Sequence, residues 1–203
     1  MTIVDYGLGN VFAFANIYKG LNIDATIART PAELERASKI ILPGVGAFDH
    51  AMDRLEQSTM RPVLDELVLH KRVPVLGVCV GMQILGRSSE EGRHRGLGWL
   101  DGEVRAFKSQ SGFDLPVPHI GWNDIDAAPG GSGLFTQLEH GSQFYFLHSF
   151  YFDCDDSADI AAASTYGIRF SCAVRRDNVY GVQFHPEKSH QQGTQLLRNF
   201  AAL

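Results

Sequence analysis

Short apolar runs alternate with longer amphipathic stretches through the first hundred residues. The apolar runs predict strands, and apolar residues at helical spacing predict helices. The expected strands cover 2–5, 23–28, 39–42 and 73–78, and the expected helices cover 10–20, 48–57 and 61–71, with a further helix opened by Thr30 as N-cap and Pro31. The run 73–78 is apolar on both faces, which is typical of a parallel strand covered by helices on both sides. The alternation predicts right-handed crossovers and a doubly wound sheet.

The second half of the chain has a different pattern. Helical periodicity is scarce between residues 98 and 180, and strand-like runs dominate. The expected strands cover 102–107, 143–152, 159–165, 170–175 and 179–184, and a last helix covers 191–201. The glycine-rich patch 129–133 is expected to form a surface loop. We therefore expect an α/β fold in one domain over residues 1–203: an open, mostly parallel, flavodoxin-like sheet flanked by helices, with an antiparallel extension in its second half.

Composition and charge narrow the class of protein. The chain has 203 residues, 44% apolar and 20% charged, which is ordinary for one globular domain. Its formal net charge of −5 argues against a nucleic-acid partner bound through a basic face. Three widely spaced cysteines give no disulfide framework and no zinc knuckle, and the eight histidines show no paired metal-ligand spacing. We expect a cytoplasmic protein with no metal, no cofactor and no membrane span, since no leader or long apolar run is present.

The strongest chemical signal is the pattern Gly77-x-Cys79-x-Gly81, directly after the expected strand 73–78. It has the form of a nucleophile elbow with cysteine in place of serine. Glycines two residues to either side remove the Cβ atoms that would clash in the tight strand-to-helix turn. The following helix N-terminus favours a thiolate. Cys154 lies among aspartates and Cys172 lies within a strand, so we interpret both as packing residues.

A second signal is the segment 185–189 (HPEKS), which follows the expected strand 179–184. A cysteine nucleophile needs a base that takes the thiol proton and a carboxylate that fixes the imidazole tautomer. His185 and Glu187 are two residues apart, and Pro186 is expected to keep the segment extended so that both side chains point to one side. The pair lies at the carboxyl edge of the sheet, where open α/β proteins place their sites.

A third signal is the segment 42–48 (LPGVGAF), at the end of the third expected strand. Acyl transfer needs two N–H donors aimed at the developing oxyanion. One is expected from Val80, the residue after the nucleophile. The other is expected from the turn Gly44–Gly46, with Val45 as the donor. An ordinary strand-to-helix turn would have the same sequence, so this assignment stays open at this point.

Together these segments resemble the class I glutamine amidotransferase family, over nearly the whole chain. Further segments resemble the glutaminase subunits of imidazole glycerol phosphate synthase within that family; they are 4–10 (VDYGLGN), 88–92 (SSEEG), 96–102 (GLGWLDG), 117–123 (VPHIGWN) and 144–152 (FYFLHSFYF). The resemblance implies hydrolysis of L-glutamine and passage of ammonia to a separate (β/α)₈ synthase in a heterodimer.

The resemblance also implies roles for individual residues. Cys79 would attack the glutamine amide, His185 would act as base and then acid, and Glu187 would orient His185. The residues expected to hold the glutamine are Gly46, Gln83, His148, Ser149 and Phe150. The family more often has Tyr where Phe150 stands, so one hydroxyl contact is missing here. Trp122, Asn123 and Lys188 are expected near the partner interface, with Trp122 in a loop.

Three other functions are considered. The first is a paralogous glutaminase that feeds a nucleotide-sugar amidotransferase, since 46–52 and 60–71 are similar to such proteins. The second is a silent interaction module, which the complete set Cys79, His185 and Glu187 argues against. The third is a peptidase or chaperone of a related fold, which typically has His directly after the nucleophile, where this chain has Val80.

Overall fold

The computed structural model describes residues 1–128 and 133–203. The patch expected as a surface loop at 129–133 lies outside the described residues apart from Gly133, which begins a 3₁₀ turn, η3 (Gly133–Phe135). Within the described ranges, no helix is long and apolar enough to cross a membrane.

The first half of the chain builds the parallel part of the main sheet. Its strands are β1 (Thr2–Val4), β2 (Thr26–Ala28), β3 (Ile40–Gly44) and β4 (Val75–Cys79), joined by β12 (Val179–Val182) from near the end of the chain. They pair in the order β2-β1-β3-β4-β12. β3, β4 and β12 are buried along their whole lengths, which explains their continuous apolar runs.

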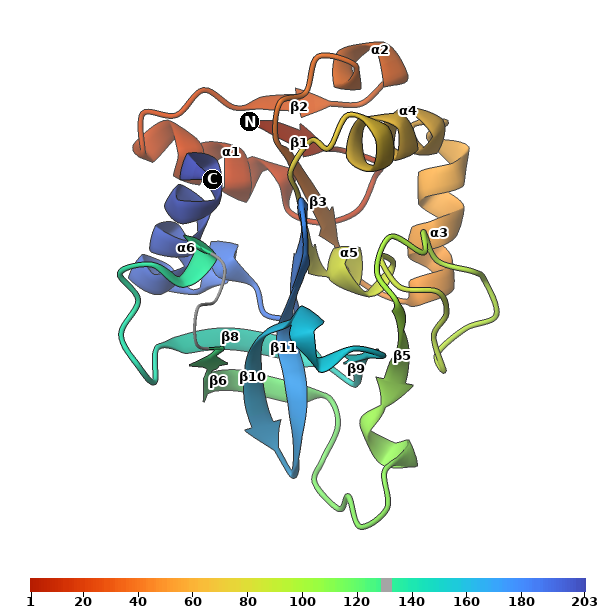
Figure 1. Cartoon of the computed structure of the whole chain (residues 1–203), viewed down its shortest axis with the longest axis vertical. Coiled ribbons are helices and arrows are strands. Elements are labelled where there is room, and N and C mark those ends of the chain that lie inside the picture. Colours follow the sequence, from red (N-terminus) through yellow and green to blue (C-terminus); the bar gives the residue numbers. More distant parts are fainter. Residues whose placement is uncertain (129–132) are drawn as a thin grey trace.

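Helices cover both faces of these parallel strands. The helices are α1 (Val11–Gly20), α2 (Pro31–Leu34), α3 (Phe48–Gln57), α4 (Arg61–Asp65), α5 (Val80–Gln83) and α6 (His190–Ala202). Figure 1 shows α1 and α6 on one side of the sheet and α3 and α4 on the other. The Thr30 cap of α2 is confirmed, with Glu33 completing a capping box. The helix expected over 61–71 is α4 followed by a π-helical turn, η1 (Glu66–His70).

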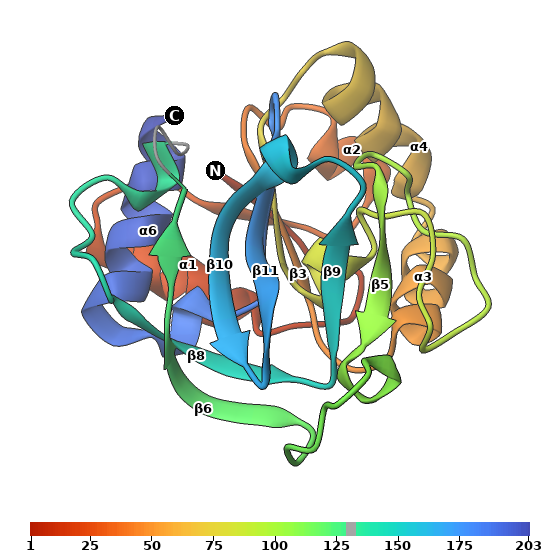
Figure 2. The same cartoon turned by 60° about the horizontal axis from the view of Figure 1, so that its bottom comes forward.

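The second half extends the sheet with antiparallel strands. β11 (Ile168–Arg176) pairs with β12, and β10 (Ile160–Tyr166) and β7 (Asp126–Ala127) follow. β9 (Phe150–Cys154) joins β11 to β5 (Gly102–Ala106). The expected fold class, a parallel sheet flanked by helices with an antiparallel extension, is confirmed (Figure 2).

Two strand expectations were wrong. The run 143–152 is not one strand: it turns at Ser149, so that β8 (Gln143–His148) and β9 belong to different sheets. Trp122 does not lie in a loop but in β6 (His119–Asp124), which pairs with β8 in a separate antiparallel ribbon. The ribbon crosses one end of the main sheet in Figure 2.

The topology collects the chemically interesting segments at one edge. β1, β3, β4 and β12 are parallel, so their carboxyl ends point the same way. Gly44 ends β3, Cys79 ends β4 and His185 follows β12. This edge is where open α/β sheets place their ligands.

Candidate active site

Cys79 occupies a strained turn between β4 and α5. Its backbone has φ 56° and ψ −115°, in a region that L residues rarely adopt. Close backbone packing requires the flanking glycines: a Cβ on Gly81 would lie 2.0 Å from the carbonyl oxygen of Leu42, and one on Gly77 would lie 2.5 Å from that of Gly81. The predicted elbow conformation is therefore confirmed.

His185 and Glu187 form a buried pair. The Nδ1–H of His185 donates to Oε1 of Glu187 over 2.8 Å, and the side chains are only 3% and 4% exposed. The expected extended segment was wrong, because Pro186 begins a 3₁₀ turn, η5 (Pro186–Lys188). Proline is suited to the first position of a helical turn. This turn brings the Glu187 carboxylate back to the imidazole ring of His185. The bond fixes the tautomer that leaves Nε2 free to exchange a proton.

The Cys79 thiol and the Glu187 carboxylate both act on the pKa of His185. Burial alone would lower the pKa of His185, but hydrogen bonds with the Cys79 thiol and the Glu187 carboxylate outweigh it and raise that pKa to about 9. Ser189 fixes the segment, because its hydroxyl donates to the carbonyl of His185 over 2.6 Å and accepts from the amide of Tyr145 over 3.0 Å. The arrangement can hold a proton next to a sulfur nucleophile.

The other two cysteines have different surroundings. Burial, and then the nearby Asp159, raises the pKa of Cys154 to about 12. Burial also raises the pKa of Cys172, which is wholly enclosed within β11. A thiol with a raised pKa is a poor nucleophile at neutral pH. These surroundings agree with the interpretation of both as packing residues.

A cavity of about 330 Å³ opens in front of Cys79. It brings together most of the residues that the sequence singled out, and its wall is formed by Val45, Gly46, Cys79, Val80, Gln83, Glu91, Pro118, Leu147, His148, Ser149, Phe150, His185 and Lys188. Gly44 lies just behind the wall, where a Cβ would come within 2.4 Å of the Gly81 amide nitrogen. The His148–Ser149–Phe150 corner reaches the cavity because the chain turns there from β8 into β9.

The turn after β3 has a fixed base and an exposed tip. The buried hydroxyl of Tyr6 donates to the carbonyl of Pro43 over 2.7 Å. Val45 is 40% exposed, and Gly46 has φ +86°, where an added Cβ would meet nothing within 4 Å. Glycine adopts positive and negative φ about equally readily, so an exposed tip of this kind can reorient its peptide groups at little cost. The turn lies beside Val80 at the cavity, and the oxyanion role of these residues stays a prediction.

Sequence reasoning missed two residues of the site. Glu91 lines the cavity, and its Oε2 accepts from the Phe48 amide over 2.8 Å. Gln183 is fully buried and its Nε2 lies 3.9 Å from Sγ of Cys79. Both lie in segments that the sequence singles out, 88–92 and 179–184, but neither residue type signals a role without the fold. Among the described residues, no group of three or more His, Cys, Asp or Glu side chains is arranged to hold a metal ion.

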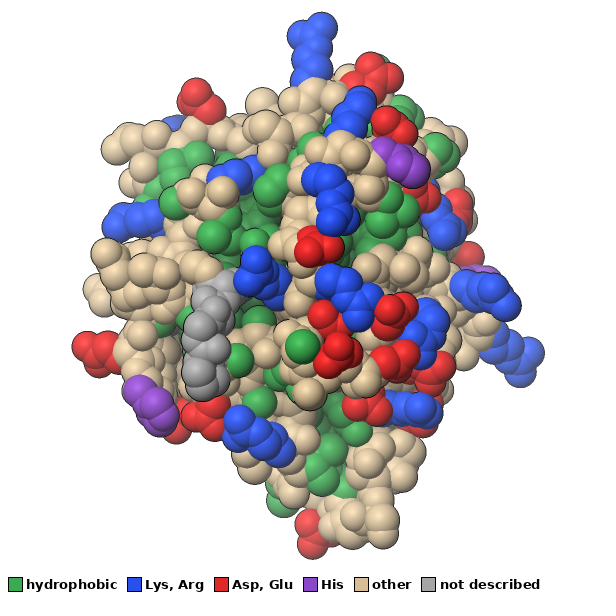
Figure 3. All heavy atoms as spheres, in the orientation of Figure 1, with side chains coloured by type: hydrophobic (Ala, Val, Ile, Leu, Met, Phe, Trp, Pro, Cys, Tyr) green, Lys and Arg blue, Asp and Glu red, His purple; other side chains and the backbone are tan. Residues whose placement is uncertain are grey.

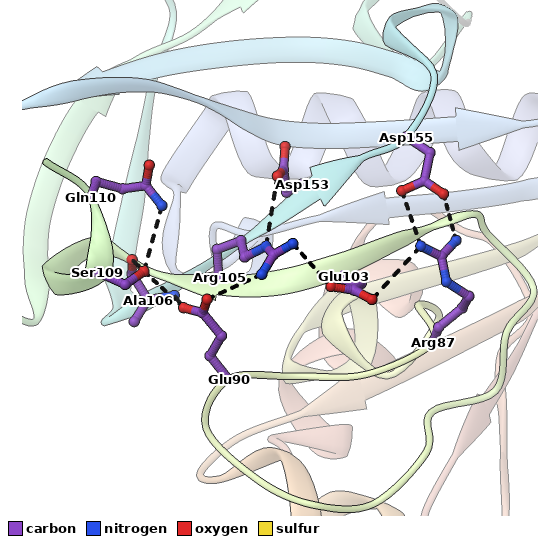
Figure 4. Close-up of polar contacts among 9 residues, drawn as sticks. All are labelled: Arg87, Glu90, Glu103, Arg105, Ala106, Ser109, Gln110, Asp153 and Asp155. Carbon is purple, nitrogen blue, oxygen red and sulfur yellow. Dashed lines mark hydrogen bonds and ion pairs between the residues drawn. The ribbon is translucent and has the colours of Figure 1, made fainter.

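A surface network of charges holds the loop that carries Glu91 (Figure 4). Oε2 of Glu90 accepts from the Ala106 amide over 2.7 Å and from the Ser109 hydroxyl over 2.8 Å. Arg105 lies 3.2 Å from Glu90, while Arg87 pairs with Asp155. Acidic and basic side chains are interspersed over this part of the surface (Figure 3). Single exposed pairs add little stability, but a network with backbone contacts fixes the loop.

The three residues expected at a partner interface have different positions. Lys188 lines the cavity, with its Nζ 5.8 Å from the centre of the Tyr145 ring. Trp122 is 44% exposed and stacks on the ring of His190, with the two ring centroids 5.1 Å apart. Asn123 is on the opposite face of β6, where its Nδ2 donates to the carbonyl of Thr165 over 2.9 Å. Their interface role stays a prediction.

Known proteins resemble this chain over nearly its whole length. The model of the family "Glutamine amidotransferase class-I" matches residues 2–203. The imidazole glycerol phosphate synthase subunit HisH of Bdellovibrio bacteriovorus is 57% identical, over 99% of this chain and 98% of the relative. The HisH subunit of Leptospira interrogans is 54% identical with the same coverage. A crystal structure of a glutamine amidotransferase superposes with a TM-score of 0.76 at 19% identity, covering 99% of this chain and 97% of that chain. The chain belongs to the class I glutamine amidotransferase family.

Proposed function

We propose that this chain is the glutaminase subunit of an imidazole glycerol phosphate synthase. As a class I glutamine amidotransferase it is an enzyme, and its relatives are named as HisH subunits of that synthase. It would hydrolyse L-glutamine to glutamate and ammonia in the cytoplasm. The ammonia would pass to a (β/α)₈ partner that makes imidazole glycerol phosphate and AICAR in histidine biosynthesis. The observation that carries this proposal is the strained Cys79 beside the His185–Glu187 pair in the wall of one cavity.

The chemistry proceeds through a thioester. The Cys79 sulfur attacks the carboxamide carbon of glutamine, and its proton resides on His185. The tetrahedral intermediate collapses when the leaving nitrogen takes that proton and departs as ammonia. Water then attacks the thioester carbon, giving its proton to His185, and the carbon–sulfur bond breaks to release glutamate and restore the thiol. Glu187 stabilises the imidazolium throughout through its 2.8 Å bond.

Backbone donors stabilise the oxyanion in both steps. The Val80 amide lies at the start of α5 next to the nucleophile, and the Gly44–Val45–Gly46 turn lies beside it at the cavity. Val45 is proposed as the second donor. One preorganised donor of this kind contributes ~10²–10³ in rate. The exposed tip of the turn allows the donor to be withdrawn or presented.

The cavity wall supplies contacts for the amino-acid end of glutamine. Gln83, the corner His148–Ser149–Phe150 and Gly46 surround it. The Glu91 carboxylate is the acidic group on the wall, so it is proposed to face the α-ammonium. The side chain of Phe150 supplies no hydroxyl, and its contribution is the backbone carbonyl, which accepts from His148 over 2.7 Å.

The β6–β8 ribbon is the proposed docking face for the synthase. Ile120, Trp122 and Leu147 are exposed there at 62%, 44% and 37%, an apolar group beside the cavity mouth. Aromatic anchors of this kind are common at the centre of interfaces. Lys188 joins this face to the cavity, and Asn123 lies beneath it. Ammonia released at Cys79 would leave through the docked partner and so escape protonation in bulk water.

The test supplies glutamine labelled with ¹⁵N in its amide to this chain mixed with a histidine-pathway synthase and its acceptor nucleotide. We expect the label in imidazole glycerol phosphate, and none with Cys79→Ala. Glutamate release that responds to a nucleotide-sugar amidotransferase, with no transfer to the histidine-pathway acceptor, would establish the paralogous function suggested by 46–52 and 60–71. Absence of glutamate release with either partner would establish a silent module.

A further inference from the structure

Two buried histidines link β6 to the cavity wall through a continuous series of hydrogen bonds. Nδ1 of His119 lies 2.9 Å from Nε2 of His148, and Nδ1 of His148 lies 2.7 Å from the carbonyl oxygen of Phe150. At the other end, Nδ2 of Asn123 lies 3.2 Å from Nε2 of His119. His119 and His148 are only 3% and 6% exposed. We call this series the Asn123–His119–His148 relay.

The Phe150 carbonyl, at the end of the relay, determines which atom donates in every hydrogen bond. A carbonyl oxygen can only accept, so Nδ1 of His148 carries the proton and Nε2 of that ring is an acceptor. Nδ1 of His119 must then donate to it, which leaves Nε2 of His119 to accept from the Asn123 amide. Both rings must be neutral for this to hold. Burial lowers the pKa of His148 to about 3 and that of His119 to about 4, which makes them neutral at pH 7.

Aromatic rings hold His119 in the plane that the relay needs. Its ring stacks on Phe146 with centroids 4.8 Å apart and on Tyr166 at 4.2 Å. Phenylalanine at this position would keep those stacks and remove both ring nitrogens. The packing and the hydrogen bonding of His119 can therefore be separated by substitution.

The relay continues into the wall around the nucleophile. The carbonyl of Phe150 also accepts from Nε2 of Gln83 over 3.3 Å. The same Nε2 donates to Oε1 of Gln183 over 3.0 Å, and Nε2 of Gln183 lies 3.9 Å from Sγ of Cys79. The position of the Phe150 carbonyl thus determines where two amide side chains lie in front of the sulfur.

We propose that His119 is a positioning residue for the glutamine site, acting through His148 on the Phe150 carbonyl and the Gln83 amide. It does not touch the cavity itself. Its strand carries Trp122 on the opposite face, so a partner that docks on the ribbon presses on the strand that holds the relay. The kinetic effect of the relay rests on the proposed glutaminase function, while its proton arrangement does not.

The proton arrangement is tested by ¹H–¹⁵N NMR of the histidine rings in the isolated chain. We expect both His148 and His119 as neutral Nδ1–H tautomers between pH 6 and 8. In His119→Phe we expect His148 to stay Nδ1–H, because the Phe150 carbonyl still requires a donor. An Nε2–H or charged His148 in the wild-type chain would overturn the relay. This measurement needs no enzymatic activity, so it decides the relay even if the glutaminase assignment fails.

The positioning role is tested by glutamine kinetics in the complex with the liganded synthase. We expect His119→Phe to raise KM for glutamine about tenfold, the effect of one lost hydrogen bond, with kcat changed less than threefold. His119→Asn keeps a donor near the Nδ1 position, so we expect KM within threefold of wild type. A merely structural role would lower the melting temperature and the active fraction of both variants and leave KM unchanged, and that result would refute the proposal.

Discussion

His119 donates a hydrogen bond to His148 across the β6–β8 ribbon, and neither ring carries a positive charge at neutral pH. Their folded-state pKa values lie below the ordinary value of 6.5, so the unfolded chain binds more protons than the folded chain in mild acid. The stability that these neutral rings allow is complete above about pH 6.5 and is lost progressively as the pH falls toward 4.

We therefore expect the free energy of unfolding to fall between pH 6.5 and 4.5, with each histidine contributing up to about 1.4 kcal/mol per pH unit. His119→Phe should make this dependence shallower. His50→Gln, at an exposed position on α3, should not. Urea unfolding at a series of pH values measures the slopes. Equal slopes in wild type and His119→Phe would show that His119 titrates normally.

Cys79 should be the site of covalent modification by a diazo-ketone analogue of glutamine. The strained turn presents its thiol to the cavity and to His185, whereas raised pKa values suppress the thiolates of Cys154 and Cys172. Peptide mass spectrometry locates the adduct, and Cys79→Ser should remain unlabelled. An adduct on Cys154 or Cys172 with Cys79 untouched would make the assignment wrong.

Glu187→Gln should fold and slow glutamine hydrolysis strongly. In a serine triad the corresponding carboxylate-to-amide substitution lowers kcat roughly 10⁴-fold. We expect a smaller loss of kcat here because a thiol is more acidic than a hydroxyl. Glu187 helps to hold the pKa of His185 at about 9, so the alkaline limb of kcat/KM should also move to lower pH in the variant. Glu35→Gln, at an exposed position, is the matched control. Full activity with an unchanged pH profile would remove Glu187 from the mechanism.

Gly81→Ala should disrupt the elbow. The new Cβ would lie 2.0 Å from a backbone oxygen of β3, so the start of α5 would have to move away from β3. We expect a loss of stability of about 1–3 kcal/mol or more and loss of glutaminase activity. Gly20→Ala, where nothing lies within 4 Å of the added carbon, should change stability by less than about 1 kcal/mol. Thermal unfolding of both variants gives the comparison, and equal stabilities would contradict the packing argument.

Glutaminase turnover should be low in the isolated chain and rise with the liganded partner. The exposed Val45–Gly46 tip allows the second oxyanion donor to face away until docking orders it, and one donor contributes ~10²–10³ in rate. The comparison is kcat at saturating glutamine with and without the partner and its ligand. Equal low rates would refute the coupling, and a fully active isolated chain would identify a free-standing glutaminase.

The elbow and the sheet core could be predicted because their signals are local. Gly77, Cys79 and Gly81 follow a strand that is apolar on both faces, and each glycine is required by a backbone contact that the motif implies. Strand β6 was missed because its pattern is inverted: Ile120 and Trp122 face solvent, while His119 and Asn123 face inward. Strand prediction assumes that the apolar positions form the buried face, and in β6 the apolar positions form the exposed face.

The remaining differences have causes that sequence patterns do not record. The apolar run 143–152 continues through Ser149, where the turn is held by the bond from His148 to the Phe150 carbonyl. Pro186 suits an extended segment and the first position of a 3₁₀ turn equally well, and the tertiary contacts of Ser189 select the turn. Gln183 and Glu91 can be assigned to the site only from the fold, which brings residues far apart in the chain to one cavity.

The position of β12 has a consequence for synthesis on the ribosome. The last strand of the chain fills the place between β4 and β11, so β4 is an unpaired edge until residue 182 has been made. A nascent chain with β1, β3 and β4 in place therefore exposes the apolar edge strand β4, a template for association with other chains. Arrival of β12 covers that edge and delivers His185 to Cys79 in the same event. A chain whose Cys79 has gained its base His185 has therefore already paired β12 with β4.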